Sequence, residues 1–223
     1  MIVAIDGPAG AGKSTVSKEV ARRLGFTCLD TGAMYRAIAW QAIQNGVDFD
    51  DSQGLDQVAN NYHIEFTYDQ GEPSPSGVLM GGVDVTRAIR TAEIDRAVSL
   101  VSKEPLVRAA LVAQQQRIGN SGNYVVEGRD IGTVVFPDAA VKVFLFASAE
   151  ERARRRVAQN AERGIGSVDY DEVLADIVKR DEIDSSRDSS PLEPAADAVM
   201  LDSSDLSIEE VIEKICQLAK AHL

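Results

Sequence analysis

Hydrophobic residues gather in short runs that predict the strands of a β-sheet. These runs cover residues 1–5, 26–29, 123–127, 141–147 and 197–202. Apolar side chains occupy consecutive rather than alternating positions, which is typical of strands that are covered on both faces. We therefore expect a buried sheet of parallel strands.

Helices are predicted between these strands. One runs to about residue 24, and another covers about 34–45, with Gly46 placed to end it. Ser148 and Ser207 each stand three residues before a glutamate and begin capping boxes directly after two of the strands. The alternation predicts an α/β fold of three layers, in which helices cover both faces of a five-stranded parallel sheet.

One region departs from this rhythm. Residues 62–85 contain short alternating segments joined by a turn-rich stretch, which predicts a small antiparallel piece. Two helices are expected after it, the second beginning at Pro105. We predict one domain over residues 1–223, with an inserted subdomain at 62–110.

Composition narrows the class of protein. The net charge of −12 argues against nucleic acid and anionic membranes as partners. No apolar run reaches the length of a membrane span, and no secretory signal pattern begins the chain, so a cytoplasmic protein is expected. Cys28 and Cys216 follow no metal or redox spacing and are expected to be buried free thiols. His63 and His222 have no neighbouring ligands, which argues against zinc or a histidine-based triad.

The segment "GPAGAGKS" (7–14) matches the phosphate-binding pattern G-x-x-x-x-G-K-[ST] between a strand and a helix. Its N–H groups can turn inward around a phosphate, and the helix N-terminus adds a favourable dipole. A chance match is expected in about one chain of this length in a hundred. Lys13 would reach the β- and γ-phosphates, and Ser14 would ligate Mg²⁺. The expected nucleotide-binding residues are Gly7, Pro8, Ala9, Gly10, Ala11, Gly12, Lys13, Ser14 and Thr15.

This loop alone leaves hydrolysis, switching and phosphoryl transfer open. The chain contains no N-K-x-D motif for reading guanine. Transfer between two anionic substrates needs additional positive charge, and arginine binds phosphate oxygens bidentately. Arg36 follows the second strand. Arg129 lies just past a central strand, at the edge where ligands of open α/β sheets collect.

Two further arginine-rich segments have more than one interpretation. Arg180, Asp184 and Arg187 would share one face of a continuing helix, either as a surface salt-bridge ladder or as a set that faces a ligand. Residues 150–156 carry four arginines, which would form a solvated helix face or part of a short lid, at 149–166, that closes over ATP. The spacing leaves these alternatives open.

Six segments together resemble a known family. They are "DGPAGAGKST", "LDTGAMYR", "IRTAEI", "EGRDIGTVVFPDA", "SAEERARRR" and "KRDEIDSSRDSSPL" with "ADAVMLDSS". Through them the chain resembles the bacterial cytidylate kinases, of the nucleoside monophosphate kinase group, over nearly its whole length. The resemblance implies transfer of the γ-phosphoryl group of ATP to CMP or dCMP with Mg²⁺, by a monomer.

The resemblance also implies a role for individual residues. Thr31 and Arg36 would contact the acceptor nucleotide, and its cytosine would be bound by Ser99, Arg108 and Asp130. Its phosphate would be bound by Arg129 and Arg187, and its sugar by Arg180 and Asp184. Arg152 and Arg156 would act from the lid. Glu127 stands where related kinases are expected to have aspartate. Its longer carboxylate could still orient water bound to Mg²⁺.

Base recognition has a chemical basis in this set. An ionised Asp130 can accept a hydrogen bond from cytosine N4 and would repel uracil O4, while Arg108 can donate to cytosine O2 or N3. An unpaired buried group costs about 1–3 kcal/mol, which corresponds to roughly 5- to 150-fold discrimination. Two alternatives remain: a kinase for another acceptor such as UMP, AMP or shikimate, and an ATP-binding regulator without transfer activity.

Overall fold

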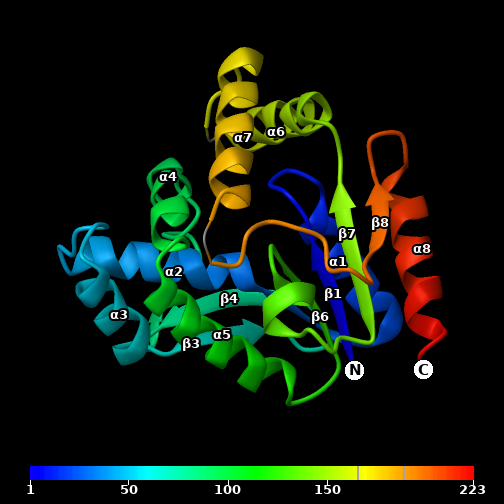
Figure 1. Cartoon of the computed structure of the whole chain (residues 1–223), viewed down its shortest axis with the longest axis horizontal. Helices are drawn as coiled ribbons and strands as arrows, with labels where there is room; N and C mark the ends of the chain where they lie inside the picture. Colours follow the sequence, from blue (N-terminus) through cyan, green and yellow to red (C-terminus); the bar gives the residue numbers. More distant parts are fainter. Residues whose placement is uncertain (165, 188) are drawn as a thin grey trace.

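The structure is a computed structural model that describes residues 1–164, 166–187 and 189–223. Within these residues the central sheet contains five parallel strands in the order β2-β6-β1-β7-β8 (Figure 1). The strands are β1 (Ile2–Asp6), β2 (Thr27–Asp30), β6 (Tyr124–Gly128), β7 (Val141–Phe146) and β8 (Val199–Asp202). Helices α1 (Lys13–Leu24) and α8 (Ile208–Lys220) cover one face, and α5 (Pro105–Gly119) and the π-helix η1 (Ile131–Val135) cover the other. The predicted three-layer α/β fold is confirmed.

Side chains of the central strands alternate between two cores. Val3 and Ile5 of β1 pack with α1 and α8, whereas Ala4 packs with η1 on the opposite face. All three are fully buried. Both faces of the strand are therefore apolar, which explains the consecutive hydrophobic runs in the sequence. Cys28 and Cys216 are buried free thiols, as predicted.

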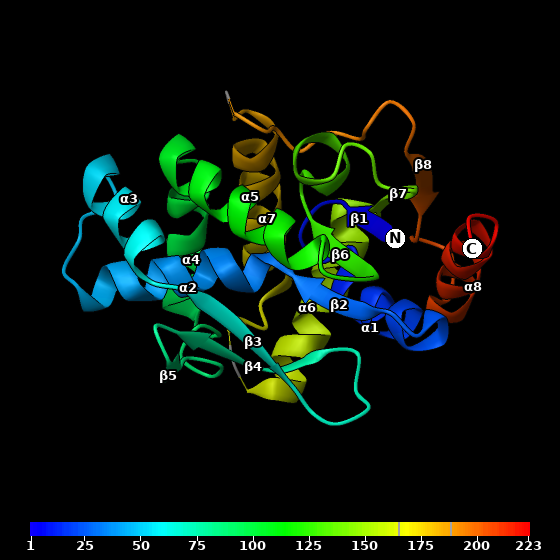
Figure 2. The same cartoon turned by 90° about the horizontal axis from the view of Figure 1, so that it is seen from below.

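An antiparallel sheet is inserted between α2 (Thr31–Gln44) and α5 (Figure 2). It contains β3 (Ile64–Tyr68), β4 (Pro75–Met80) and β5 (Val83–Asp84), preceded by α3 (Ser52–Asn61) and followed by α4 (Ala92–Val101). Val78 and Met80 of β4 pack in one hydrophobic cluster with Ile38 of α2, and Trp40 packs against that cluster. The insert thus shares a core with the helix that follows the second central strand. Helix α3 was not predicted.

The turn of the inserted hairpin covers part of an edge of the central sheet. Strand β2 lies at that edge. The Cys28 N–H donates to the Pro73 carbonyl oxygen at 2.7 Å, and the Tyr68 hydroxyl donates to the Cys28 carbonyl oxygen at 3.2 Å. An exposed strand edge can pair with other chains, so these two bonds protect β2.

Helices α6 (Ala149–Arg163) and α7 (Tyr170–Ser185) lie side by side above the carboxyl ends of the strands (Figure 1). The Ser148 hydroxyl caps α6, because it accepts from the Glu151 N–H at 3.2 Å. The Ser148 N–H donates to the Ser204 hydroxyl at 3.1 Å instead of to Glu151, so the predicted capping box forms only in part, whereas the one at Ser207 and Glu210 is complete. Helix α7 ends at Ser185, so the expectation that it continues through Arg187 is wrong. Residue 165 of the predicted lid lies outside the described residues.

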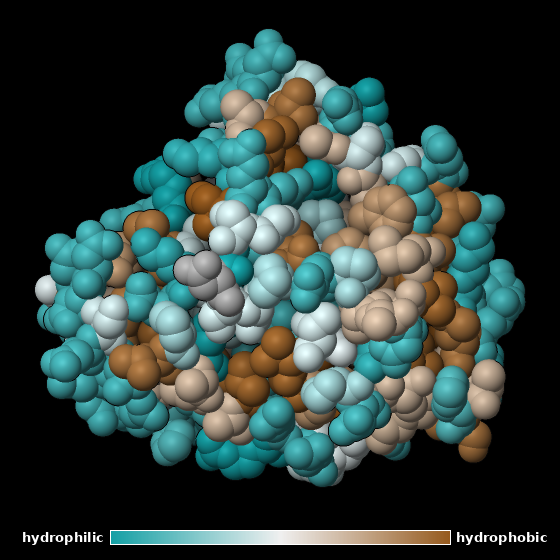
Figure 3. Space-filling model, viewed as in Figure 1, coloured by the Kyte–Doolittle hydropathy of each residue, from teal (hydrophilic) through white to brown (hydrophobic). Residues whose placement is uncertain are grey.

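The face of the molecule in Figure 3 is mostly hydrophilic, with smaller hydrophobic areas between the hydrophilic residues. Among the described residues, no helix has both the length and the apolar character that a bilayer crossing requires.

A buried carboxylate links β1 to η1. Asp6, at the end of β1, accepts from the Ile131 N–H at 2.8 Å and from the Gly132 N–H at 2.7 Å. These are amide groups of the first turn of η1, where no helical carbonyl is available to them. Burial raises the pKa of Asp6 to about 6, although the two N–H groups act in the opposite direction. The chain after β6 is thereby held against the start of the phosphate loop.

The shared core predicts cooperative unfolding of the insert and the central sheet. Met80→Ala is expected to lower the free energy of unfolding by about 2–5 kcal/mol, because it leaves a cavity beside α2. Val83→Ala, at a side chain that is 55% exposed on the same hairpin, should change it by about 0.5 kcal/mol or less. Urea unfolding would be followed by Trp40 fluorescence and by far-UV circular dichroism. The two transitions should coincide, and separate transitions would contradict a shared core.

The buried Asp6 predicts a pH dependence of stability. Its raised pKa means that the folded chain holds this proton more tightly than the unfolded chain does. Its contribution to stability is therefore fully present below about pH 4 and is lost as pH rises through about 6, by about 3 kcal/mol in total. The stability of the wild type relative to Asp6→Asn, from urea titrations without nucleotide, should fall between pH 4 and 7. A constant difference would show that Asp6 titrates at its ordinary pKa.

Candidate functional site

The loop at residues 7–12 joins β1 to α1 and curls around the side chain of Lys13. The buried Lys13 Nζ donates to the carbonyl oxygens of Gly7 at 2.7 Å and Pro8 at 2.8 Å. A Cβ on Gly7 would lie 1.9 Å from the Leu145 carbonyl oxygen of β7, so only glycine fits where the loop crosses the sheet. Burial lowers the pKa of Lys13 well below its usual value. The loop thus surrounds an ammonium group whose hydrogen-bond acceptors, among the described residues, are backbone carbonyls and no carboxylate.

Parallel pairing of β1 with β6 brings Glu127 to this loop. Asp6 and Gly128 are opposite each other in the register, so both strands end together. The Ser14 hydroxyl donates to a Glu127 carboxylate oxygen at 2.8 Å. Burial, and then the charge of Asp30, raise the pKa of Glu127. The longer carboxylate therefore reaches the serine, and the pair offers the oxygen ligands that Mg²⁺ prefers.

No group of three or more metal-binding side chains occurs among the described residues. A cation at Ser14 and Glu127 would therefore draw its remaining ligands from phosphate oxygens and water, which is usual for Mg²⁺ at nucleotide sites.

Arg108 and Asp130 form a buried ion pair. Arg108 lies on α5 and Asp130 at the start of η1. The Arg108 side chain is 4% exposed, and its guanidinium carbon lies 5.6 Å from the ring centroid of Tyr35. This distance allows a cation–π contact. A hydrogen-bond acceptor and a donor therefore lie side by side, and their role in reading the base stays a prediction.

Ser99 lies in the last turn of α4, but a residue that was not predicted, Ser102, contacts Arg108 of this pair. The Ser102 carbonyl oxygen accepts from Arg108 at 3.2 Å, and the Ser102 hydroxyl accepts from Arg187 at 2.9 Å. The carbonyl oxygen of Ser99 accepts from that hydroxyl at 3.3 Å. Nothing in the sequence distinguishes Ser102 from an ordinary serine at a helix end.

Asp184 contacts two of the arginines that were predicted to bind the phosphate of the acceptor nucleotide. It accepts from Arg129 Nε at 3.0 Å and forms an ion pair with Arg187. Burial alone would raise the pKa of Asp184, but Arg129, Arg187 and Arg180 outweigh it and lower the pKa. Burial, and then Arg129, lower the pKa of Arg180 to about 10. Positive charge is therefore crowded around one buried carboxylate.

Arg36 belongs to the same cluster of cations. On α2, it forms an ion pair with Asp95 of α4 at 2.8 Å. Asp95 was not predicted, because an acidic residue on a helix usually faces solvent. The Nε atoms of Arg36, Arg180 and Arg187 are buried and have no hydrogen-bond partner among the described residues. These three guanidinium groups therefore keep an unused donor, and the buried Nε of Arg108 is a fourth such donor among the described residues.

The predicted lid arginines lie on α6. Arg152 is buried and pairs with Asp181 of α7 at 2.6 Å, and it donates to the Ala9 carbonyl oxygen of the phosphate loop at 3.1 Å. Arg156 is half-buried on the same helix. Arg155, which was not predicted, donates to the Ser203 carbonyl oxygen after β8 at 2.6 Å. The lid role of Arg152 and Arg156 stays a prediction.

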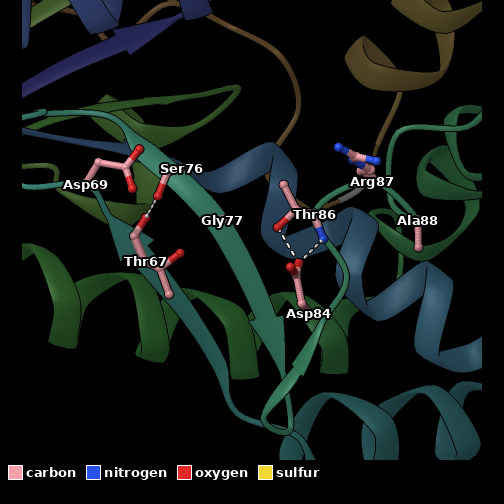
Figure 4. Close-up of a pocket in the computed structure, with 8 residues that line it drawn as sticks. All are labelled: Thr67, Asp69, Ser76, Gly77, Asp84, Thr86, Arg87 and Ala88. Carbon is pink, nitrogen blue, oxygen red and sulfur yellow. Dashed lines mark hydrogen bonds between the residues drawn. The ribbon is translucent and has the colours of Figure 1, made fainter.

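A hollow of about 620 Å³ lies elsewhere, on the inserted sheet (Figure 4). Thr86 donates to Asp84 and Ser76 donates to Thr67 at its wall. The predicted site residues do not line it. The arginine cluster beside the phosphate loop contains buried charged groups with shifted pKa values, which are typical of functional sites. We therefore take the cluster, rather than this open hollow, as the candidate site.

Comparison with known sequences gives one family. The sequence model described as cytidylate kinase matches residues 3–221. The cytidylate kinase of Shouchella clausii (strain KSM-K16) is 48% identical over 220 residues, which cover 99% of this chain and 96% of that protein. The bifunctional pantoate ligase/cytidylate kinase of Trichormus variabilis (strain ATCC 29413 / PCC 7937) is 51% identical over 214 residues. That match covers 96% of this chain, which spans only 40% of the longer relative.

Solved structures agree on the fold. An uncharacterised protein from Eubacterium ventriosum ATCC 27560 superimposes with a TM-score of 0.53 at 12% identity, with 99% of each chain covered. Shikimate kinase from Bacteroides thetaiotaomicron gives a TM-score of 0.50 at 12% identity, covering 99% of this chain and 98% of that one. At such low identity only the fold is comparable. The sequence matches confirm the resemblance carried by the motifs, and the chain belongs to the cytidylate kinase family.

Proposed function

We propose that this chain transfers the γ-phosphoryl group of ATP to CMP or dCMP, which yields ADP and CDP or dCDP. Membership of the cytidylate kinase family supports this reaction. One observation carries the proposal: three buried Nε donors, on Arg36, Arg180 and Arg187, have no hydrogen-bond partner in the part of the chain that the structure describes. Such donors fit a second anion, and an acceptor nucleotide supplies one as its phosphate.

ATP would bind along residues 7–15. The Lys13 ammonium would exchange the carbonyl oxygens of Gly7 and Pro8 for the β- and γ-phosphates. Because nearby negative charge favours the protonated amine, bound ATP would offset the effect of burial on the pKa of Lys13. Ser14 and Glu127 would hold Mg²⁺, which neutralises charge on the β- and γ-phosphate oxygens when bound.

The acceptor nucleotide would bind between the arginines and the buried pair. Its phosphate would contact Arg129 and Arg187, and at Arg36 it would replace the carboxylate of Asp95. The remaining assignments follow the family: Thr31 to the acceptor, Arg180 and Asp184 to the sugar, and Ser99, Arg108 and Asp130 to the cytosine. The whole acceptor would then lie within the reach of α2, α4, α5 and α7.

Transfer needs no general base, because the acceptor phosphate is already an anionic nucleophile. One of its oxygens attacks the γ-phosphorus, and the bond from that phosphorus to the bridging oxygen breaks, so that its electron pair leaves with ADP. Lys13, Arg129 and Arg187 would neutralise the charge that the two nucleotides bring together. Arg152 and Arg156, in the lid proposed at 149–166, would help to exclude water from this reaction.

The organisation of the chain fits this reaction. The insert at 62–110 would serve as the acceptor-binding subdomain, since it carries Asp95 and Arg108. We infer a monomer acting in the cytoplasm, because one chain supplies residues for both nucleotides and needs no partner for catalysis.

An ADP-release assay with a panel of acceptors tests the function. With ATP and Mg²⁺, CMP and dCMP should support turnover at least about 5-fold better in kcat/KM than UMP or AMP, because the unpaired group left by a wrong base is costly. Lys13→Ala should abolish turnover with every acceptor while the circular dichroism spectrum stays unchanged. ADP release that needs no acceptor, or that prefers AMP, would overturn the proposed function.

Base recognition by Asp130 predicts a selective defect. Asp130→Ala should lower kcat/KM for CMP by about 5- to 150-fold and leave the KM for ATP nearly unchanged, because the Asp130 side chain pairs with Arg108 of α5 and not with a residue of the phosphate loop. Asp130→Asn keeps the shape and adds an N–H donor, so its preference should move toward UMP. Steady-state kinetics with each nucleotide varied in turn would measure both effects. Equal losses for ATP and CMP would contradict this role.

A further inference from the structure

Ser102 connects two groups that the proposed function assigns to opposite ends of the acceptor. It is 8% exposed and lies directly after α4. Its carbonyl oxygen accepts from Arg108 Nη1 at 3.2 Å, and its hydroxyl accepts from Arg187 Nη2 at 2.9 Å. Arg108 belongs to the base-reading pair, and Arg187 belongs to the phosphate-binding arginines.

The contacts form one continuous network. Asp130 pairs with Arg108, Ser102 joins Arg108 to Arg187, and Asp184 joins Arg187 to Arg129. The side chains of Arg108 and Arg187 are 4% and 5% exposed, so water does little to weaken these interactions. Within this network, Ser102 is the point where the base-reading pair meets the phosphate-binding arginines.

Arg187 depends on such side-chain contacts for its position. Helix α7 ends at Ser185, so no helical backbone holds Arg187 in place. Two groups fix its Nη2, the Asp184 carboxylate and the Ser102 hydroxyl. Its Nε has no partner among the described residues and remains able to donate to a ligand.

The hydroxyl of Ser102 is oriented by a second bond. It donates to the carbonyl oxygen of Ser99 at 3.3 Å, which leaves its lone pairs to accept from Arg187. The last carbonyl groups of a helix carry partial negative charge, which favours cations such as Arg108 and Arg187 at this end of α4. Capping of α4 does not need the hydroxyl, because the Ser102 backbone N–H donates to the Val98 carbonyl oxygen.

We propose that Ser102 is a positioning residue that holds Arg187 at a fixed position relative to Arg108 and Asp130. A nucleotide whose cytosine pairs with these two residues would then place its phosphate against Arg187. The inference rests on the proposed function and adds a residue to it. Ser102 itself touches neither base nor phosphate in this scheme. Its effect passes through Arg187, so it should act on ligands that carry a phosphate and spare ligands that do not.

The test compares the binding of CMP with that of cytidine, which lacks the phosphate. Ser102→Ala should weaken CMP binding by about 5- to 10-fold, since a hydrogen bond to a charged group is lost, and change cytidine binding by less than about 2-fold. Calorimetry would measure CMP, and competition against CMP would measure cytidine. Ser121→Ala is the matched control, because the exposed Ser121 hydroxyl also donates to a carbonyl three residues earlier, at 2.7 Å.

A double-mutant cycle tests the route through Arg187. In an Arg187→Ala background, Ser102→Ala should change CMP affinity by less than about 2-fold, because the group that it positions is gone. Unchanged CMP affinity in the single variant, equal losses for CMP and cytidine, or a full effect without Arg187 would each overturn the inference. A wild-type chain that fails to phosphorylate CMP would instead overturn the proposed function, so the two failures are distinguishable.

Discussion

Arg129 is the cation around which the other positive charges at the carboxyl edge of the central sheet are crowded. After burial, Arg129 and Arg36 lower the pKa of Arg180, and Arg108 and Arg129 lower that of Arg187. Arg129 also lowers the pKa of Lys13. Such crowding is stable only where carboxylates compensate it. Asp184 supplies this compensation between Arg129 and Arg187, and Asp95 and Asp130 do the same at Arg36 and Arg108. A bound anion would reduce the repulsion that remains among these cations.

The register of two strands brings the two anion sites together. Because β1 and β6 are parallel neighbours with Asp6 opposite Gly128, the phosphate loop and the segment from Arg129 onward leave the sheet at the same edge. Two contacts then join these segments. Ser14 donates to Glu127, and Asp6 accepts from the first amide groups of η1. A donor and an acceptor nucleotide bound here would therefore meet over the same strand ends.

The inserted sheet contributes by sharing its core with α2. Val78 and Met80 pack in the same cluster as Ile38, so the insert and the helix that carries Arg36 form one packed unit. The same cluster includes Val101 and Val107, which lie next to Ser102 and Arg108. Close packing of this kind resists small displacements, so Arg36, Ser102 and Arg108 are held at fixed separations.

The sequence by itself determined the class of fold and the phosphate loop. Consecutive apolar runs predict a doubly covered sheet, and the loop pattern has a local cause, since each glycine and Lys13 acts within a few residues of chain. The roles of Ser99, Arg108 and Asp130 could be proposed only through the family resemblance. Arg36 was suggested by its place after a strand and Asp184 by its spacing, but neither pattern decides whether a side chain faces a ligand or solvent. The continuing helix through Arg187 was wrong, since spacing alone does not show where a helix ends.

Only the tertiary structure decided which charges meet. Asp6 and Ile131 are 125 residues apart, and Arg187 and Ser102 are 85 residues apart, so no sequence pattern connects them. The pairing of Arg36 with Asp95 and the contact between Arg152 and the phosphate loop have the same origin. Each depends on how helices from distant parts of the chain pack at one sheet edge. Periodicity records which face of an element is buried, but it carries no information about the partner against which that face is buried.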